Sequence, residues 1–319
     1  MSTIHKTILG LIVAGSCIAA CAPGEDATAS TPAGEFSTVV SPAVPSSMTF
    51  CGQKVDLDRT DMYERLDREL TSLAYTHGNT LLTIKRANRF FPMMAPILKR
   101  NGVPDDMLYL ACIESTLNTR ALSPAKAAGL WQFMPDTGRQ YGLEVNEWVD
   151  ERYHPEKATA AACRYLKKAY EKYGNWESVA ASYNGGMGRI SSELDKQIVN
   201  SAYDLYLVDE TTRYMFRLLA TKLIMEHPAD YGFRLSDDQL YQPIEYTEVE
   251  VSEPVDDWAL WAKRKGINYM ILREHNPWIR AKSLPNKSGK TYIVKIPTKE
   301  SLSRSGQKKK TYNSNWTVK

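Results

Sequence analysis

The stretch YLACIESTLN, residues 109–118, places a glutamate on the otherwise apolar face of a predicted helix. The segment 104–106, Pro-Asp-Asp, precedes it, and proline and acidic residues favour the first turn of a helix. At helical spacing one stripe is formed by Met107, Leu110, Ala111, Glu114 and Leu117. A carboxyl group on a buried face loses water, so its pKa rises and it can act as a general acid. The alternative is a structural role for Glu114, paired with an arginine or capping a neighbouring element.

Three further segments follow in the chain: AGLWQFMP at 128–135, ASYNGG at 181–186 and ETTRY at 210–214. With IESTLN at 113–118 they resemble, in order and spacing, the motifs of the lysozyme-like lytic transglycosylases. Within that family the resemblance is closest to the membrane-bound type D, which is commonly a lipoprotein. It covers residues 105–225, and four motifs in order are far more specific than any one of them.

The resemblance implies a role for each matched residue in the first two motifs. Glu114 would be the single catalytic acid and base. Ser115 would belong to the substrate site mainly as a structural hydrogen-bonder, and Ser123 would contact the substrate N-acetyl group or position water. Gln132 would line the sugar cleft, next to Trp131, which is either part of the core or a platform for sugar.

The last two motifs imply further substrate contacts. Asn184 would hydrogen-bond the sugar or its acetamido group, beside Tyr183, and Tyr214 would lie near the acid. Glu210 is expected to pair with a cation or cap its helix, and we assign it no catalytic role.

The resemblance implies a mainly α fold with a lysozyme-like catalytic domain that cleaves the MurNAc-β-1,4-GlcNAc bond of peptidoglycan. Because the pattern contains one carboxylate, the substrate's 2-acetamido oxygen would attack C1. Closure of the C6 hydroxyl on C1 would give a 1,6-anhydro sugar, without a cofactor or metal. The alternatives are a goose-type lysozyme, which uses water as acceptor, and a non-catalytic peptidoglycan-binding scaffold, against which Glu114 argues.

The N-terminus has the pattern of a secretory signal: His5 and Lys6 precede an apolar run, residues 7–20, too short to span a membrane. Ile18-Ala19-Ala20-Cys21 resembles a lipobox, so Cys21 is the predicted lipidation site and Cys17 is a second candidate. A plain signal peptide is the alternative. We therefore expect a periplasmic protein held on a membrane by lipid, with the outer membrane favoured because Ala22 is not Asp.

Composition divides the rest of the chain. After the signal peptide (1–20) we expect a flexible linker (21–55), an almost all-helical domain (56–235), a small module (240–300) and a disordered tail (301–319). Helical patterns are expected within 58–99, where Pro92 and Pro96 should kink or interrupt the second of two helices. Further helices are expected from Pro135 to near Gly142 and over 155–173 (ending at Gly174), 175–184 and 210–227. The module reads strand, helix, helix, strand, and it resembles a divergent LysM module that binds peptidoglycan glycan strands. The alternative is a packing subdomain without a ligand.

The net charge of +3 is too small to indicate nucleic-acid binding, and the oligomeric state stays open. Besides Cys17 and Cys21 the chain has three cysteines, Cys51, Cys112 and Cys163, and an oxidising compartment permits one disulfide between them. Three pairings are possible, of which Cys51–Cys163 is preferred, with Cys112 a buried thiol.

Overall fold

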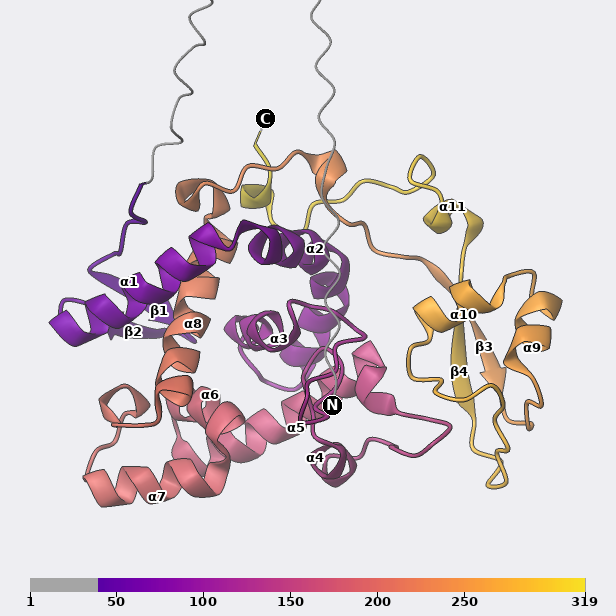
Figure 1. Ribbon diagram of the computed structural model, residues 1–319, viewed down its shortest axis with the longest axis horizontal. Coiled ribbons are helices and arrows are strands. Elements are labelled where there is room, and N and C mark those ends of the chain that lie inside the picture. The colour runs from indigo at the N-terminus through magenta and orange to yellow at the C-terminus, as the bar shows by residue number, and fades with distance from the viewer. Residues whose placement is uncertain (1–39, 319) are drawn as a thin grey trace, which may run out of the picture. The chain divides into compact units, whose positions relative to one another are not determined.

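The computed structural model describes residues 40–318, and the helical content of this part is high (Figure 1). The predicted signal peptide, Cys17 and Cys21 lie outside the described residues. The first eight α-helices of the described part are α1 (Thr60–Tyr75), α2 (His77–Arg100), α3 (Leu108–Ser115), α4 (Pro135–Gln140), α5 (Pro155–Tyr173), α6 (Trp176–Gly185), α7 (Met187–Gln197) and α8 (Asp209–Glu226). The strands are β1 (Ser47–Phe50), β2 (Gln53–Asp56), β3 (Tyr246–Val251) and β4 (Tyr292–Pro297), and the other α-helices are α9 (Trp258–Arg264), α10 (Tyr269–His275) and α11 (Lys299–Leu302).

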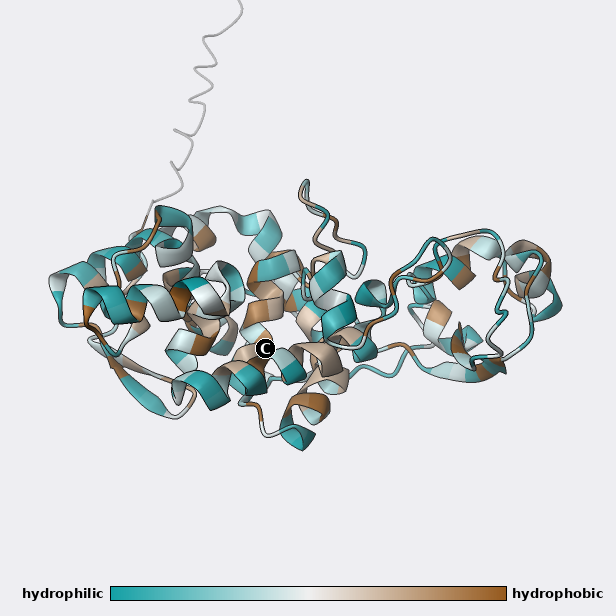
Figure 2. Cartoon of the chain, turned by 90° about the horizontal axis from the view of Figure 1, so that it is seen from below, coloured by the Kyte–Doolittle hydropathy of each residue, from teal (hydrophilic) through white to brown (hydrophobic). Residues whose placement is uncertain are grey.

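Helix α3 lies inside a ring of helices. The ring closes through the contacts of α1 with α2, α2 with α5, α5 with α6, α6 with α8, and α8 with α1, and α3 contacts both α2 and α8 (Figure 1). Leu110 and Ala111 of α3 are fully buried. Figure 2 shows hydrophobic and hydrophilic residues alternating along the same helices, as expected for amphipathic helices around one core. The Glu114 helix is therefore the central element of the fold.

Most helix boundaries agree with the sequence. Helix α5 spans the predicted 155–173 and ends at Gly174, which has the left-handed backbone (φ 69°) typical of a helix C-terminus. Helices α4, α6 and α8 also begin and end within a residue or two of the prediction. The predicted stripe holds as far as Glu114, but Leu117 follows the helix in a left-handed conformation, with φ 55°. Helix α7 was not predicted.

Pro92 and Pro96 do not interrupt α2, which runs without a break from His77 to Arg100. Both prolines are exposed, so the carbonyl groups that lose a helical partner can bind water. The opposite face carries Phe91 and Met94, which are buried in the core. Packing of that face outweighs the local preference to break the helix, so the expected interruption was wrong, while the alternative, a kink, stays a prediction.

The segment expected to be a flexible linker contains an antiparallel hairpin, β1 and β2, with Ser47 opposite Asp56. Phe50 is 2% exposed and packs into the main core. At the turn, the backbone N–H of Cys51 donates to Asp106 Oδ2 at 2.6 Å, just before α3. The few apolar residues of this segment are enough to fix it, so the prediction of flexibility was wrong for residues 46–55.

The C-terminal tail is also ordered, contrary to the prediction. Trp316 is 2% exposed in the main core and donates its indole N–H to the Met225 carbonyl at 2.6 Å. The side-chain amide of Asn88, in α2, makes two hydrogen bonds to the backbone of the tail. Its Nδ2 donates to Lys310 O at 2.9 Å, and its Oδ1 accepts from Tyr312 N at 2.8 Å. One buried tryptophan and a buried amide hold a segment whose composition resembles that of a disordered chain.

The C-terminal module has the predicted strand, helix, helix, strand order. Strands β3 and β4 pair antiparallel, with Tyr246 opposite Pro297 and Val251 opposite Tyr292. Its apolar core includes Trp258 and Leu272 from the two helices, and also Val149, which comes from the segment between α4 and α5. The larger part of the chain therefore supplies a side chain to the core of the module.

The described cysteines, Cys51, Cys112 and Cys163, are free. The preferred Cys51–Cys163 disulfide is therefore not formed, while Cys112 is a buried thiol as expected, with 3% exposure. Within residues 40–318, no helix combines the length and the apolar character needed to cross a bilayer.

Substitution Trp316→Ala should lower the free energy of unfolding by about 3–5 kcal/mol, because it opens a large cavity in the core. Chemical denaturation of the purified protein measures this loss. Leu302→Ala, at a nearby exposed position (43% exposed), is the control and should change the free energy of unfolding by less than about 1 kcal/mol. Equal effects of the two substitutions would contradict the packed position of the tail.

Candidate active site

Glu114 lies in the last turn of α3 and faces α8. The phenolic O–H of Tyr214, which is 5% exposed, donates to Glu114 Oε1 at 2.7 Å. Tyr214 comes from the ETTRY motif, so the first and last motifs of the sequence meet at this hydrogen bond. The predicted proximity of Tyr214 to Glu114 is seen directly in this contact.

Burial raises the pKa of Glu114 from its ordinary value of 4.5 to about 7. The hydrogen bond from Tyr214 and the positive charge of Arg217 oppose this shift, and the negative charge of Glu210 adds to it. Desolvation is the largest of these effects. At neutral pH the carboxyl group therefore exists in both forms, which suits a group that gives up a proton and later takes one back.

The loop between α3 and α4 is exposed at residues 122 and 124–126 but has a buried inner part, residues 128–131. Ala128, Leu130 and Trp131 are each at most 1% exposed. Ser115 Oγ donates to Leu130 O at 2.9 Å, and Tyr183 Oη donates to Trp131 O at 2.7 Å. Arg152 Nη1 donates to Lys126 O at 2.7 Å and to Phe133 O at 2.9 Å. Side chains from three other segments thus satisfy four carbonyl groups of the loop.

Gly129 is where the loop lies closest to the rest of the chain. Its φ is +77°, and a Cβ atom placed there would lie 1.9 Å from the backbone oxygen of Arg152. No side chain fits this space, and the backbone conformation itself favours glycine. The glycine of the G-L-x-Q motif is therefore required by the contact with Arg152 and by the turn.

A cavity of about 260 Å³ brings together three of the predicted residues, Gln132, Tyr183 and Asn184. The ring of Tyr183 packs edge-on against Phe133 and Tyr165, in the wall of this cavity. Gln132 donates from Nε2 to Gly129 O at 2.8 Å. The side-chain amide of Asn184 has no hydrogen-bond partner among the described residues, so it is free to bind a ligand in the cavity.

Burial holds the pKa of Tyr183 well above its ordinary value, and the charge of Glu114 contributes to the same direction. Tyr183 therefore stays a neutral hydrogen-bond donor. Tyr183 also links Glu114 with the cavity, because its side chain lines the cavity and the charge of Glu114 contributes to its raised pKa.

The other candidate residues have structural contacts. Ser115 binds Ala111 O as well as Leu130 O, which agrees with a structural role. Ser123 lies in a tight turn, where its Oγ accepts from Ala127 N at 2.9 Å, and it does not line the cavity. Trp131 is fully buried and donates to Thr159 Oγ1 at 3.0 Å, so it is a core residue and not a sugar platform.

Two residues of this region escaped the sequence analysis. Arg152 is 5% exposed and pairs with Asp150, with 2.7 Å between Nη2 and Oδ2. The Tyr141 hydroxyl lies in the wall of the cavity and is buried without a hydrogen-bond partner among the described residues. An Asp-x-Arg sequence in a loop is too common to signal such a pair, and Tyr141 matches no motif.

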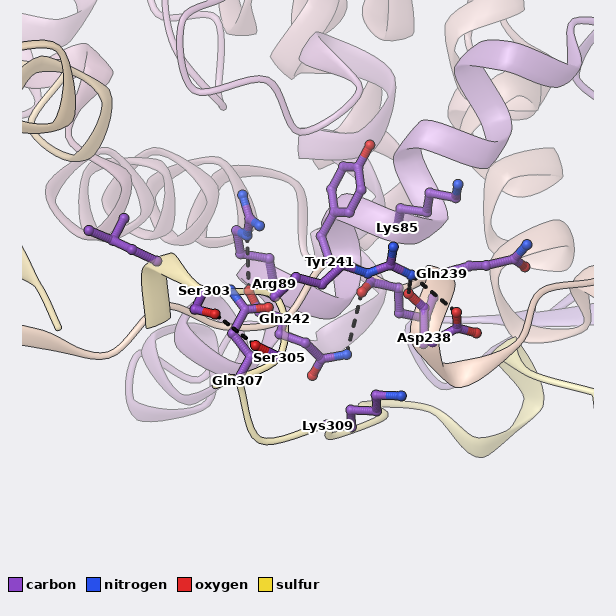
Figure 3. A pocket seen from close by; sticks show the side chains of 13 residues that line it. Lys85, Arg89, Asp238, Gln239, Tyr241, Gln242, Ser303, Ser305, Gln307 and Lys309 are labelled. Carbon is purple, nitrogen blue, oxygen red and sulfur yellow. Dashed lines mark hydrogen bonds and ion pairs between the residues drawn. The ribbon is translucent and has the colours of Figure 1, made fainter. Parts of the chain in front are cut away.

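A larger cavity, of about 1120 Å³, lies between α2 and the C-terminal tail and contains none of the motif residues (Figure 3). Basic side chains line it, among them Lys85, Arg89 and Lys309, and Arg304 pairs there with Asp238 at 3.1 Å. Within residues 40–318, no group of three or more His, Cys, Asp and Glu side chains is arranged to hold a metal ion. The candidate active site therefore rests on Glu114 and the smaller cavity.

Comparison with known protein families gives two matches. Residues 93–204 match the transglycosylase SLT domain, and residues 247–300 match the C-terminal LysM-like domain of soluble lytic transglycosylase. Among curated proteins, membrane-bound lytic murein transglycosylase D of Escherichia coli K12 is 29% identical over 241 residues, which are 74% of this chain and 51% of that protein. The chain thus spans about half the length of the curated relative.

Two solved structures are also similar in part. The 70-kDa soluble lytic transglycosylase of Escherichia coli aligns over 53% of this chain and 33% of its own, with 22% identity and a TM-score of 0.37. An inactive variant of the lytic transglycosylase Slt from Pseudomonas aeruginosa aligns over 44% and 24%, with 20% identity and a TM-score of 0.34.

Substitution Gly129→Ala should lower the free energy of unfolding by about 3–5 kcal/mol, because overpacking against Arg152 adds to backbone strain. Gly174→Ala is the matched control, since Gly174 has a similar φ of +69° but no atom near its missing Cβ. Strain alone should cost that variant about 1–2 kcal/mol. Chemical denaturation of both variants measures the difference, and equal losses would show that the close approach of Arg152 costs nothing.

The raised pKa of Glu114 predicts a pH-dependent stability. Between pH 4.5 and about 7 the folded state binds more protons at Glu114 than the unfolded state, so wild-type stability falls as the pH rises. The variant Glu114→Gln has no ionisable group at this position, so its stability does not fall for this reason as the pH rises. Its Tm relative to wild type should therefore be higher at pH 8 than at pH 5, as measured by calorimetry. Glu64→Gln, at an exposed glutamate of α1, should show no such trend, and a parallel response of both variants would contradict the burial effect.

Proposed function

We propose that this chain, which carries a transglycosylase SLT domain and a LysM-like domain and is homologous to membrane-bound lytic murein transglycosylase D, is itself a peptidoglycan lytic transglycosylase. It cleaves the MurNAc-β-1,4-GlcNAc bond without water and leaves 1,6-anhydro-MurNAc ends, in remodelling or turnover of the cell wall. The observation that carries this proposal is Glu114, a buried carboxyl group whose pKa is raised to about 7 and whose charge acts on Tyr183, in the wall of a cavity lined by polar and aromatic side chains.

In the first step the protonated Glu114 gives its proton to the glycosidic oxygen, and the bond from that oxygen to C1 of MurNAc breaks. The 2-acetamido oxygen of the same sugar bonds to C1 and takes the place of a second carboxylate. In the second step the Glu114 carboxylate removes the proton of the C6 hydroxyl. The C6 oxygen then bonds to C1 and displaces the acetamido oxygen, so that Glu114 is protonated again and no water is consumed.

Tyr214 supports both steps. Its hydroxyl donates to Glu114 Oε1, which leaves Oε2 to carry the proton that is transferred. The same hydrogen bond stabilises the carboxylate after the first step, since a donor favours the charged form. Tyr214 therefore orients the acid and moderates the effect of burial on its pKa.

The remaining candidate residues would hold the substrate. The free amide of Asn184 and the side chain of Gln132 face the cavity and would bind the sugar hydroxyl and acetamido groups. Tyr183 would contribute its ring face. Ser123 does not line this cavity and would bind the acetamido oxygen outside it, with the hydroxyl hydrogen that is left free when its Oγ accepts from Ala127 N. Ser115 would act by holding the loop.

Cys21 is the proposed lipid-anchored N-terminus, which would place the enzyme in the periplasm on the outer membrane. The match of residues 247–300 to a LysM-like domain supports glycan strands as the partner of the module as well. Membrane attachment of the curated relative, stated in its name, supports the anchor.

Digestion of purified peptidoglycan followed by mass spectrometry tests the proposal. Wild type should release muropeptides with anhydro ends, each lighter by one water molecule than the product of hydrolysis. Glu114→Gln should lower the rate by about a hundredfold or more, because the proton donor is lost. Glu64→Gln should release products at the wild-type rate.

Two outcomes would contradict the proposal. Reducing MurNAc ends in place of anhydro ends would identify a hydrolytic lysozyme. Equal release of soluble muropeptides by Glu114→Gln and wild type would remove Glu114 from catalysis and leave a binding protein.

A further inference from the structure

We propose that the C-terminal module fixes the position of the catalytic loop, residues 121–133, through the segment 148–152, and that Arg152 is a positioning residue. The effect on catalysis rests on the proposed function, whereas the mechanical coupling does not. Three sets of contacts carry this coupling: from the module to the segment, along the segment, and from the segment to the loop.

The module binds the segment through backbone and core. Val149 and Ile279 form an antiparallel bridge, flanked by hydrogen bonds from Asp150 N to Trp278 O at 2.9 Å and from Arg280 N to Trp148 O at 2.8 Å. The side chain of Val149 is 1% exposed and belongs to the apolar core of the module. The segment is thus held as one more piece of that module.

Charged side chains reinforce the same joint. Glu144 accepts hydrogen bonds from Lys290 Nζ at 2.5 Å and from Tyr292 Oη at 3.0 Å. Lys295 of β4 also pairs with Glu156 in the first turn of α5. Residues on both sides of the segment 148–152 therefore bind the module.

Within the segment, Asp150 and Arg152 form a buried ion pair, with 2.9 Å between Arg152 Nε and Asp150 Oδ1 and 2.7 Å between Nη2 and Oδ2. Asp150 is the residue whose backbone N–H binds the module. Because the guanidinium group is planar and rigid, a shift of Asp150 must move all of its nitrogens together. The pair therefore transmits the position of the module along the chain.

The third nitrogen, Nη1, holds the loop by its bonds to Lys126 O and Phe133 O. Phe133 lines the cavity and follows Gln132, whose left-handed backbone (φ 48°) must be held by its surroundings. The carbonyl group of Arg152 also packs against Gly129, on the same loop. A displacement of Arg152 would therefore reach the residues that bind the sugar, whereas Glu114 and Tyr214 would keep their contact.

The test compares two equal substitutions in the core of the module, in the full-length protein. Val149→Ala and Val294→Ala each remove two methyl groups from buried positions of the same core, but Val294 lies on β4, paired with Val249, and takes no part in the bridge between Val149 and Ile279. Hydrogen–deuterium exchange of residues 126–133 measures the order of the loop, and kinetics on peptidoglycan give kcat and KM. Melting of both variants controls for their global stability.

We expect faster exchange across residues 126–133 in Val149→Ala than in Val294→Ala, and a kcat/KM lower by on the order of threefold to tenfold. Arg152→Lys keeps the positive charge but loses the planar guanidinium group that binds Asp150 and the loop together, and it should show the same pattern. Exchange in Val149→Ala that matches Val294→Ala would overturn the inference, as would an equal kcat/KM in an active enzyme. Absence of any peptidoglycan cleavage by wild type, with the exchange difference present, would reject the proposed function and leave the coupling standing.

Discussion

The structure around Glu114 depends on how an irregular loop with a buried inner part, residues 128–131, satisfies its backbone. Helices pair their polar groups along the whole element, whereas this loop makes only a few short-range backbone hydrogen bonds. Other carbonyl groups of the loop are bound by side chains of Ser115, Tyr183 and Arg152. Two of these donors, Ser115 and Tyr183, are motif residues, so the motifs have a structural role besides the catalytic role proposed for them. Ser115 and Tyr183 are the sequence neighbours of Glu114 and Asn184, so the proposed acid and the proposed sugar-binding amide lie beside residues that hold the loop.

The same interior sets the chemistry of the acid. Removing water from Glu114 raises its pKa, and a single hydrogen bond from Tyr214 limits the rise, so that the value reaches about 7. In the proposed mechanism a fully apolar pocket would hold the proton too tightly for the second step, and a salt bridge would prevent the first. The contact between α3 and α8 therefore determines more than packing, because among residues 40–318 it brings a neutral donor, and no cation, within hydrogen-bonding distance of the carboxyl group.

Much of the fold could be predicted from helix periodicity, caps and turn residues, as the limits of α5 and the strand order of the module confirm. The errors share one physical cause. Flexibility of residues 46–55 and of the tail was inferred from average composition, yet Phe50 and Trp316 each find a place in a core formed by distant helices. The prolines of α2 break helices in isolation, but here the buried face of that helix is fixed by its neighbours. Composition reports what a segment can do alone, and burial depends on what surrounds it.

For the candidate site, too, some features could be predicted from the sequence and others only from the tertiary structure. By itself the sequence determined that Glu114 lies on an apolar helical face and that four motifs follow in order, because both are properties of spacing along the chain. Only the tertiary structure decided which residues face the acid, that Trp131 and Ser115 support the loop, and that Arg152 binds it. Such contacts join positions far apart in the sequence, such as Glu114 and Tyr214, or Arg152 and Lys126. Hydrogen bonds over that separation depend on how helices pack, and helix packing is a property of the whole core, which no local pattern contains.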